Sequence, residues 1–535
     1  MEINYAQEIE NLTKKLVSIK SVCGKKESEN KIATFIYNYF SKLSYFKKHP
    51  DYIKTYDCGN NRLSAISYIK GKGNETIVLM GHIDTVDVLD YGKIQNLAFN
   101  PDKLIDALKK EFILDKEVLT DIDSNDYLFG RGALDMKAGV AAYMEIMKYF
   151  SNHIDELNGN LVFICECDEE GDSSGILKSL DILKEIKEKE NFKYLALING
   201  DYANVKGSDR YIYHGTVGKL LPCFMVVGKE SHVGNPFNAF DPNLLLSLIN
   251  KNMTLNMELC DVDEAQSTVP PISLKQNDNK DSYTVQTALS AISYFNYLTY
   301  TSSPEDVMKK CLKIGKASFQ EAIDLMNDNY QKYCLLNKQK YHKLPYKVNV
   351  YTYEKWNELL NRNPNYSKQI SKYGKKLLKE NPNIDMRDYS YKVLLKSYEY
   401  YEDKKPVLII FFGSMYYSSI KTDNPRILNA LDSAIKKVQK ESTYNIKLKA
   451  YYPFISDMSF LSTPFNRKQI EPLFTNTVYP INYPYEKIHN LNIPVINIGT
   501  YGKDGHTFVE RLEKTYSFNE MPKLVYETIK AFFVK

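Results

Sequence analysis

The chain has 535 residues, of which 43% are hydrophobic and 25% charged, close to an average globular protein. A single hydrophobic core stops growing well below this length, so at least two domains are expected. The 70 basic and 66 acidic side chains leave a net charge of only +4 without a long run of one sign, which argues against a nucleic-acid partner.

We expect neither a membrane segment nor an export signal. Charged residues occur in positions 1–15, where a signal peptide would need an apolar stretch, and no run approaches the ~18 apolar residues of a membrane span. Eight unevenly spread cysteines do not make a disulfide framework and suit a reducing compartment. The sequence therefore predicts a cytoplasmic protein without a membrane partner.

The first part of the chain alternates between helical and extended patterns. Apolar residues at helical spacing predict helices over Tyr5–Leu16, Ile32–Phe40 and Met136–Phe150. Short apolar runs predict strands over Leu63–Ile69, Thr76–Met80, Leu161–Cys167 and Tyr194–Ile198. This alternation favours an α/β fold, a mixed sheet flanked by helices, in which ligands gather just beyond the strand ends.

The pattern changes from about Tyr211, which predicts an inserted α+β unit at residues 212–403. Within it we expect a strand over Leu221–Val227, a long helix from Ser303 and an enlarged helical elaboration at residues 337–405. A buried strand over Pro406–Phe412 predicts the return to the first domain. The expected organisation is one domain from residues 1–211 and 404–535, interrupted by the insert.

The strand over Thr76–Met80 leads directly into His82 and Asp84. Because these residues lie two apart at a strand end, their side chains point to the same side. The carboxylate can then orient the imidazole while the other ring nitrogen faces a metal. A histidine satisfied by a neighbouring acid is an equally good interpretation of this pair alone.

Two further motifs offer carboxylates. Asp135 lies in the glycine-containing segment Gly130–Gly139 at the start of a predicted helix, where it suits either a ligand or a helix cap. Four acidic residues then fall within positions 166–170, after a run of five apolar residues, and repel one another unless cations compensate. An exposed acidic turn is the common alternative for this second motif.

Asp201 follows the strand Tyr194–Ile198, and His506 follows a predicted strand over Pro494–Ile498. Five motifs that each place His, Asp or Glu just beyond a strand or at a helix start are hard to explain as independent accidents. Imidazoles combined with carboxylates suit zinc, cobalt or manganese, whereas calcium and magnesium favour oxygen ligands throughout. The sequence therefore predicts a metal site.

In type and order these motifs resemble those of peptidase family M20, co-catalytic metallopeptidases that include carboxypeptidase G, acetylornithine deacetylase and succinyl-diaminopimelate desuccinylase. The resemblance covers residues 1 to about 235 and about 404 to 535. Within the insert, Pro270–Lys275 and Tyr283–Thr287 are similar to the arginine-utilisation, RocB-like subgroup. The resemblance implies a zinc-exopeptidase-like catalytic domain and an inserted lid and dimerisation domain.

The resemblance also implies roles for individual residues. It implies two divalent cations, zinc before cobalt or manganese, with five protein ligands: His82, Asp135, Glu170, Asp201 and His506. Asp135 would bridge the cations, with His82 and Asp201 completing one site and Glu170 and His506 the other. Glu169 would be the general base, and Asp84 would orient His82. His232, in the segment Gly228–His232, would come from the partner subunit of a homodimer and help to hold the oxyanion.

The predicted reaction is hydrolysis of a peptide or N-acyl amide bond of a small amino-acid-derived substrate, with arginine or ornithine catabolism as the metabolic hypothesis. Two other interpretations stay open: an aminopeptidase acting on short peptides, and a non-catalytic metal-binding protein that uses its tyrosine-rich insert as an interaction surface. Many relatives grip a substrate carboxylate with an arginine, which is missing from Phe295–Pro304. The usual Gly-x-Asn-Ala is replaced by Ala239–Pro242. The sequence therefore does not define how a substrate carboxylate would be bound.

Overall fold

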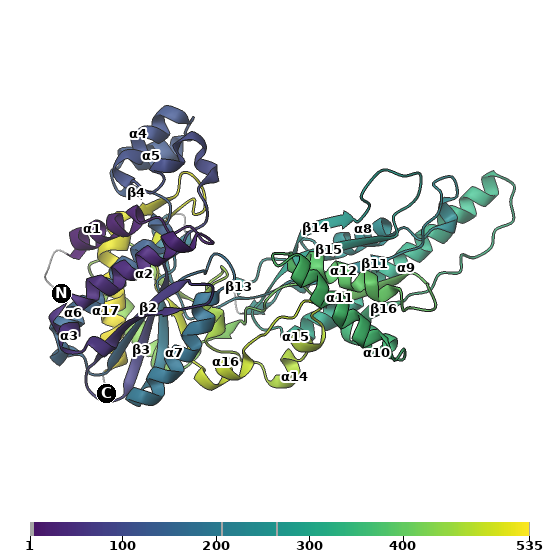
Figure 1. Cartoon of the computed structure of the whole chain (residues 1–535). Helices are drawn as coiled ribbons and strands as arrows, with labels where there is room; N and C mark the ends of the chain where they lie inside the picture. The colour runs from purple at the N-terminus through teal and green to yellow at the C-terminus, as the bar shows by residue number, and fades with distance from the viewer. Residues whose placement is uncertain (1–4, 205–206, 264–265, 534–535) are drawn as a thin grey trace. The chain divides into compact units, whose positions relative to one another are not determined.

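The computed structural model describes residues 5–204, 207–263 and 266–533, which form two units (Figure 1). The first unit combines Met1–Thr216, Ile420–Thr463 and Pro484–Lys535, and the second combines Val217–Ser419 and Pro464–Tyr483. In the described part of the chain, no helix combines the length and the apolar character needed to cross a membrane.

The first unit is built on an eight-stranded mixed sheet. In spatial order its strands are β1 (Ile53–Asp57), β2 (Leu63–Lys70), β5 (Asn160–Glu166), β3 (Glu75–His82), β6 (Lys193–Asn199), β20 (Val495–Asn497), β8 (Asp209–Tyr213) and β19 (Asn445–Lys449). The four central strands β5, β3, β6 and β20 are parallel, and all but the first residue of β3 and the first three residues of β6 are buried. Their carboxyl ends therefore meet at one edge of the sheet.

Helices cover both faces of this sheet, as the α/β prediction requires. The helices are α1 (Tyr5–Ser18), α2 (Lys26–Ser41), α3 (Ser44–Lys48), α4 (Pro101–Glu111), α5 (Lys116–Asp123), α6 (Ala138–Asn152), α7 (Ser174–Glu190), α13 (Pro425–Val438), α16 (Tyr485–Leu491) and α17 (Met521–Phe532). Side chains of β5 alternate between them: Phe163 packs on Phe40 of α2 and Tyr143 of α6, and Glu166 faces α7. The α/β class with a mixed sheet is confirmed.

A second, four-stranded sheet of the first unit is made of very short strands. They are β4 (Tyr127–Phe129), β22 (Arg511–Glu513), β21 (Tyr501–Lys503) and β7 (Ala203–Asn204). The segments that contain Asp135, Asp201 and His506 follow β4, precede β7 and follow β21, respectively. This small sheet therefore joins three segments that are distant in the sequence.

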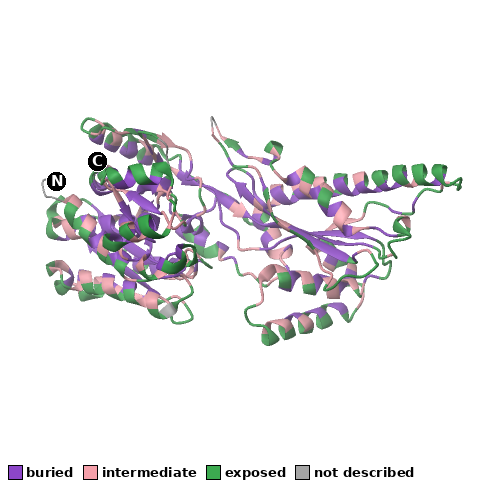
Figure 2. Ribbon diagram, turned by 90° about the horizontal axis from the view of Figure 1, so that it is seen from above, coloured by how far each residue is buried: buried purple, intermediate pink, exposed green. Residues whose placement is uncertain are grey.

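The second unit is built on a six-stranded sheet. Its strands are β10 (Gly218–Leu220), β15 (Ser290–Thr299), β11 (Pro222–Val227), β17 (Val407–Phe412) and β16 (Val350–Thr352) in order, with β14 (Ile272–Asp278) also paired to β15. Its helices are α8 (Pro242–Met253), α9 (Pro304–Leu336), α10 (Tyr353–Leu360), α11 (Tyr366–Glu380), α12 (Met386–Tyr398), α14 (Arg467–Ile470) and α15 (Pro472–Thr475). Figure 2 shows buried residues along the strands and exposed residues on the outer sides of the helices.

The elaboration at residues 337–405 supplies the apolar cover for one face of the second sheet. Ile409 and Phe411 of β17 belong to one cluster with Trp356, Leu360 and Val393 from helices α10 and α12. Trp356 is fully buried, and its indole N–H donates to Ser397 Oγ at 2.8 Å. The fully buried indole suggests that this insertion is structural.

The domain boundaries expected from the sequence differ from the observed ones. The strand Val407–Phe412 was expected in the first domain, but it pairs along its whole length with β11 of the second unit. The chain returns to the first unit at Ile420, and Pro464–Tyr483 belongs to the second unit again. An all-apolar strand suits either sheet equally well, so its sequence cannot show which partner it will pair with.

Candidate active site

The predicted ligands lie at the carboxyl edge of the parallel strands in the first unit. His82 is the last residue of β3 and is the register partner of Glu166 on β5, so the acidic turn at residues 168–170 begins beside it. Asp201 follows β6, the neighbour of β3 on its other side. Gly499 follows β20, and a Cβ atom there would lie 1.6 Å from the carbonyl oxygen of Asp201. Only glycine allows this close approach.

Asp135 connects the two predicted ligand groups. Its Oδ1 lies 2.8 Å from His82 Nε2, and its Oδ2 lies 2.8 Å from His506 Nε2. The same nitrogen of His506 is 2.9 Å from Glu170 Oε1. His506 has a φ of +65°, a left-handed conformation that residues other than glycine adopt rarely.

Three combinations of these side chains bring ligand atoms within 4.8 Å of one another, which is close enough to share a cation. The combinations are His82, Asp135 and Asp201; Asp135, Glu170 and His506; and His82, Glu169 and Glu170. The first two share Asp135, as the resemblance implied for a two-metal site. The third shows that geometry alone would also allow Glu169 as a ligand.

Asp84 contacts its neighbours differently from the sequence prediction. His82 Nδ1 lies 3.1 Å from the backbone carbonyl of Asp84 and 3.7 Å from its carboxylate Oδ1. The Asp84 carboxylate instead accepts the backbone N–H groups of Glu169 and Glu170, at 3.2 and 3.1 Å. The main chain of Asp84 thus orients the imidazole, and its side chain holds the turn that carries the two glutamates.

His232 is the one predicted site residue that belongs to the second unit. It is exposed on a loop, where its Nδ1 accepts the N–H of Gly234 at 3.0 Å and its backbone bridges to Gln286. The structure therefore brings together seven of the eight predicted site residues, namely Asp84, Glu169 and the five ligands, within the first unit.

The cluster contains more carboxyl groups than imidazoles, and much of it is buried. Asp84, Asp135 and Asp201 are buried, and Glu169 and Glu170 are half-buried, with two imidazoles beside them. Burial, with the nearby Asp135 carboxylate, raises the pKa of Asp201 to about 7. Hydrogen bonds to Asp135 and Glu170 raise the pKa of His506 to about 10. Carboxylates held this close attract compensating positive charge, and divalent cations would supply it.

The donor set agrees with such cations. Two imidazole nitrogens and the carboxylate oxygens of Asp135, Glu170 and Asp201 form the first two combinations. Mixed nitrogen and oxygen ligation suits zinc, cobalt or manganese. The residues present therefore fit a pair of divalent cations.

Two residues that the sequence analysis missed hold Asp135 in place. Glu510, which is buried, accepts the backbone N–H groups of Leu134 and Asp135 with its Oε1, at 3.1 and 3.4 Å. Its Oε2 accepts from the buried Arg131 Nη1 at 2.8 Å. Arg131 lies in the same glycine-containing motif as Asp135, and Glu510 lies four residues after His506, so both were close to motifs already identified.

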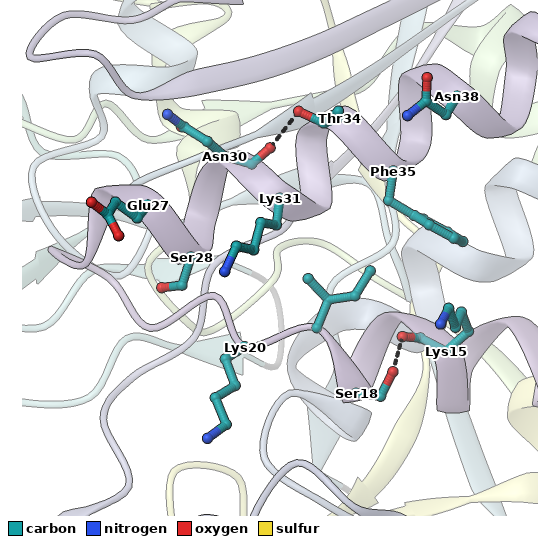
Figure 3. Close-up of a pocket in the computed structure, with 11 residues that line it drawn as sticks. Lys15, Ser18, Lys20, Glu27, Ser28, Asn30, Lys31, Thr34, Phe35 and Asn38 are labelled. Atoms are coloured by element: carbon teal, nitrogen blue, oxygen red, sulfur yellow. Dashed lines mark hydrogen bonds between the residues drawn. The ribbon is translucent and has the colours of Figure 1, made fainter.

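A groove of about 710 Å³ opens between α1 and α2 of the same unit (Figure 3). It is lined by three lysines and Glu27, by neutral polar side chains, and by the apolar Ile19 and Phe35. None of its lining residues belongs to the predicted ligand set, so the groove is separate from the candidate active site.

Comparison with known proteins agrees with this geometry. The family model described as peptidase family M20/M25/M40 matches residues 78–492. Protein RocB of Bacillus subtilis (strain 168) is 32% identical, over 98% of this chain and 95% of that protein. A succinyl-diaminopimelate desuccinylase of Orientia tsutsugamushi (strain Ikeda) is 25% identical over 56% of this chain and 70% of its own.

Among solved structures, the aminopeptidase PepT of Bacillus cereus ATCC 10987 superposes with a TM-score of 0.55. The two chains are 14% identical, and 98% of each is covered. At this identity the superposition shows a shared fold alone. Fold, ligand cluster and family match together define a metal-dependent hydrolase of peptide or amide bonds. The chain belongs to peptidase family M20/M25/M40.

Proposed function

We propose that the first unit hydrolyses a peptide or N-acyl amide bond of a small amino-acid-derived substrate with two divalent cations, most readily zinc. The observation that carries the proposal is the pair of ligand combinations that share Asp135. His82 and Asp201 would hold one cation, and Glu170 and His506 the other. When bound, such a pair of cations polarises the amide carbonyl and makes a water molecule more acidic.

Glu169 acts as the general base in this proposal. Its carboxylate takes a proton from the attacking water and later delivers the proton to the leaving nitrogen. Burial raises the pKa of Glu169 well above its ordinary value, which suits a carboxyl that holds a proton between the two transfers. The Asp84 carboxylate accepts the backbone N–H groups of Glu169 and Glu170, which fixes the turn that carries both glutamates.

We extend the proposal to a homodimer in which the partner subunit's His232 helps to hold the oxyanion. The exposed position of His232 on a loop of the second unit supports this extension. The similarity to RocB and to the arginine-utilisation subgroup supports an arginine- or ornithine-derived substrate. The eight free cysteines suit the reducing cytoplasm as the place of the reaction.

The proposal is tested by hydrolysis of N-acyl amino acids and dipeptides, including arginine and ornithine derivatives, after loading with zinc, cobalt or manganese. Glu169→Gln should lower turnover by about 10²–10⁴-fold, the usual share of a general base. It should still bind the cations, because both ligand combinations stay intact. Glu188→Gln on the exposed face of α7 is the matched control and should behave as wild type.

Two outcomes would contradict the proposal. Full turnover by Glu169→Gln would remove Glu169 as the base. Bound cations without turnover of any substrate would instead favour the non-catalytic metal-binding alternative.

A further inference from the structure

Tyr202 directly follows the ligand Asp201 and is held at both sides of its backbone. Its N–H donates to Asp201 Oδ1 at 2.8 Å, and its carbonyl oxygen accepts from the hydroxyl of Tyr452 at 2.7 Å. Tyr452 is fully buried. The position of Tyr202 is therefore tied directly to that of a predicted cation ligand.

Contacts on two sides also fix the ring of Tyr202. It stacks on Phe454, with ring centroids 5.9 Å apart and planes inclined by 16°. A Cβ atom on Gly505 would lie 2.5 Å from the Tyr202 hydroxyl oxygen, so this oxygen lies against the backbone immediately before His506. The hydroxyl therefore lies beside the segments that carry Asp201 and His506.

The hydroxyl of Tyr202 differs from those of nearby tyrosines. Tyr143 donates to the carbonyl of Ile498, Tyr452 donates to Tyr202, and Tyr501 donates to Tyr211. Among the described residues, the Tyr202 hydroxyl has no hydrogen-bond partner, although the side chain is half-buried. Unlike the hydroxyls of Tyr91 and Tyr451, it is also not a buried oxygen, so it is accessible and can donate a hydrogen bond to a molecule that binds there.

Phe454 adds an apolar surface to the same place. Its side chain is 38% exposed, although it stacks on Tyr202 and makes an edge contact with Tyr452. The ring centroids of Phe454 and Tyr452 are 5.5 Å apart. An exposed aromatic ring that is fixed by two others offers a rigid, flat contact for a planar or apolar group.

We infer that the Tyr202 hydroxyl donates a hydrogen bond to an oxygen of the bound substrate, and that Tyr202 and Phe454 form an aromatic wall that contacts a planar or apolar substrate group. This inference rests on the proposed hydrolytic function. At neutral pH a phenol is protonated and is a donor, and the substrate amide supplies acceptor oxygens.

Tyr202→Phe tests the inference because it removes one oxygen atom and keeps the ring. We expect kcat/KM to fall about 10- to 100-fold, the usual effect of losing a hydrogen bond to a charged or developing charged group. The thermal midpoint and the bound cations should stay unchanged, because the hydroxyl makes no hydrogen bond to any residue that the structure describes. Tyr211→Phe, which loses a hydroxyl bonded to Asp209 at 3.1 Å, is the matched control and should keep full activity.

The changes in kcat and KM of Tyr202→Phe show which kind of substrate oxygen accepts the hydrogen bond from Tyr202. A fall in kcat at constant KM indicates an oxygen that gains charge in the transition state, and a rise in KM indicates an oxygen bound equally in both states. Phe454→Leu should raise KM more for substrates with planar side chains than for small ones. Both variants are assayed beside wild type and Glu169→Gln.

The inference is overturned if Tyr202→Phe keeps the wild-type kcat and KM while wild type is active and Glu169→Gln is not. That result would leave the proposed function intact. A lower thermal midpoint or fewer bound cations in Tyr202→Phe would instead show a structural hydroxyl and would also overturn it. If wild type itself hydrolyses nothing, the proposed function fails and this inference falls with it.

Discussion

Both units contain apolar strands, but the side chains buried next to those strands differ. At the edge of the first sheet, buried carboxylates such as Asp84, Asp135 and Asp201 lie within one cluster. The second unit packs Trp356, Ile409 and Phe411 into an apolar core in which the indole N–H meets a neutral serine. Clustered buried carboxylates destabilise the edge of the first sheet unless positive charge compensates them, whereas the apolar cluster around Trp356 stabilises the second unit by itself.

Trp356 is the residue whose substitution should lower stability most, and the effect should be confined to the second unit. Trp356→Ala should destabilise the second unit by about 3–5 kcal/mol, because it leaves a large cavity beneath β17. Hydrogen exchange resolved by segment should become faster in β16, β17 and α10–α12 and stay unchanged in β3 and β5. Trp356→Phe, which keeps most of the buried ring and loses the bond to Ser397, should cost about 1 kcal/mol. Equal acceleration in both sheets would show that the units do not respond separately.

Removal of divalent cations should lower the stability of the first unit and leave the second unit unchanged. With cations at about 100–1,000 times their dissociation constant, chelation should cost the first unit about 3–4 kcal/mol for each cation that is removed. Faster exchange is expected in the segments around Asp135, Asp201 and His506, with α10–α12 unaffected. A chelator that changes nothing would contradict a cation site at this cluster.

The chelated protein should also depend on pH in a defined direction. The folded pKa of Asp201 is raised to about 7 and that of His506 to about 10, so the folded state binds protons more tightly than the unfolded state. Stability is then present at low pH and is lost as pH rises, from about 4 to 7 for Asp201 and from about 6.5 to 10 for His506. Denaturation at pH 5 and pH 9, with and without cations, measures this loss, which cations should reduce. A chelated protein that is more stable at pH 9 would contradict the assignment.

The smallest expected effect is a loss of metal affinity when a residue that supports Asp135 is changed. Glu510→Gln weakens the contacts to Arg131 and to the N–H groups of Leu134 and Asp135. Loss of such a supporting contact ordinarily lowers metal affinity about 10- to 100-fold. Calorimetric titration with zinc measures it, and Glu513→Gln, three residues later on β22, is a control that retains every predicted ligand. Unchanged affinity in Glu510→Gln would mean that the backbone positions Asp135 without help.

Some local features were predictable because they depend on short stretches of sequence. Strand β3 was predicted from the apolar run Thr76–Met80, which leads into His82, and the run Tyr194–Ile198 of β6 leads into Asp201 in the same way. The helix expected from Met136 begins at Ala138, because Asp135 and Met136 have non-helical backbone angles. The metal-binding and catalytic roles of these residues stay predictions.

Other features depend on partners far away in the chain. The three-residue strands β4, β21 and β22 are too short to carry a periodic signal, yet they join the segments of Asp135 and His506. The carboxylate of Asp84 was expected to orient His82, but the two N–H groups of the turn at Glu169 and Glu170 compete for it.

The α/β class, the order of the strands that lead into His82, Glu170 and Asp201, and the types of side chain available for chemistry could all be inferred from the sequence. This was possible because hydrophobic periodicity and strand ends are local properties. Long-range packing was needed to show that β17 joins the second sheet, that Glu510 and Arg131 support Asp135, and that the Tyr202 hydroxyl has no hydrogen-bond partner among the described residues. These outcomes depend on which distant segments become neighbours, and on which acceptor is nearest once the chain has folded.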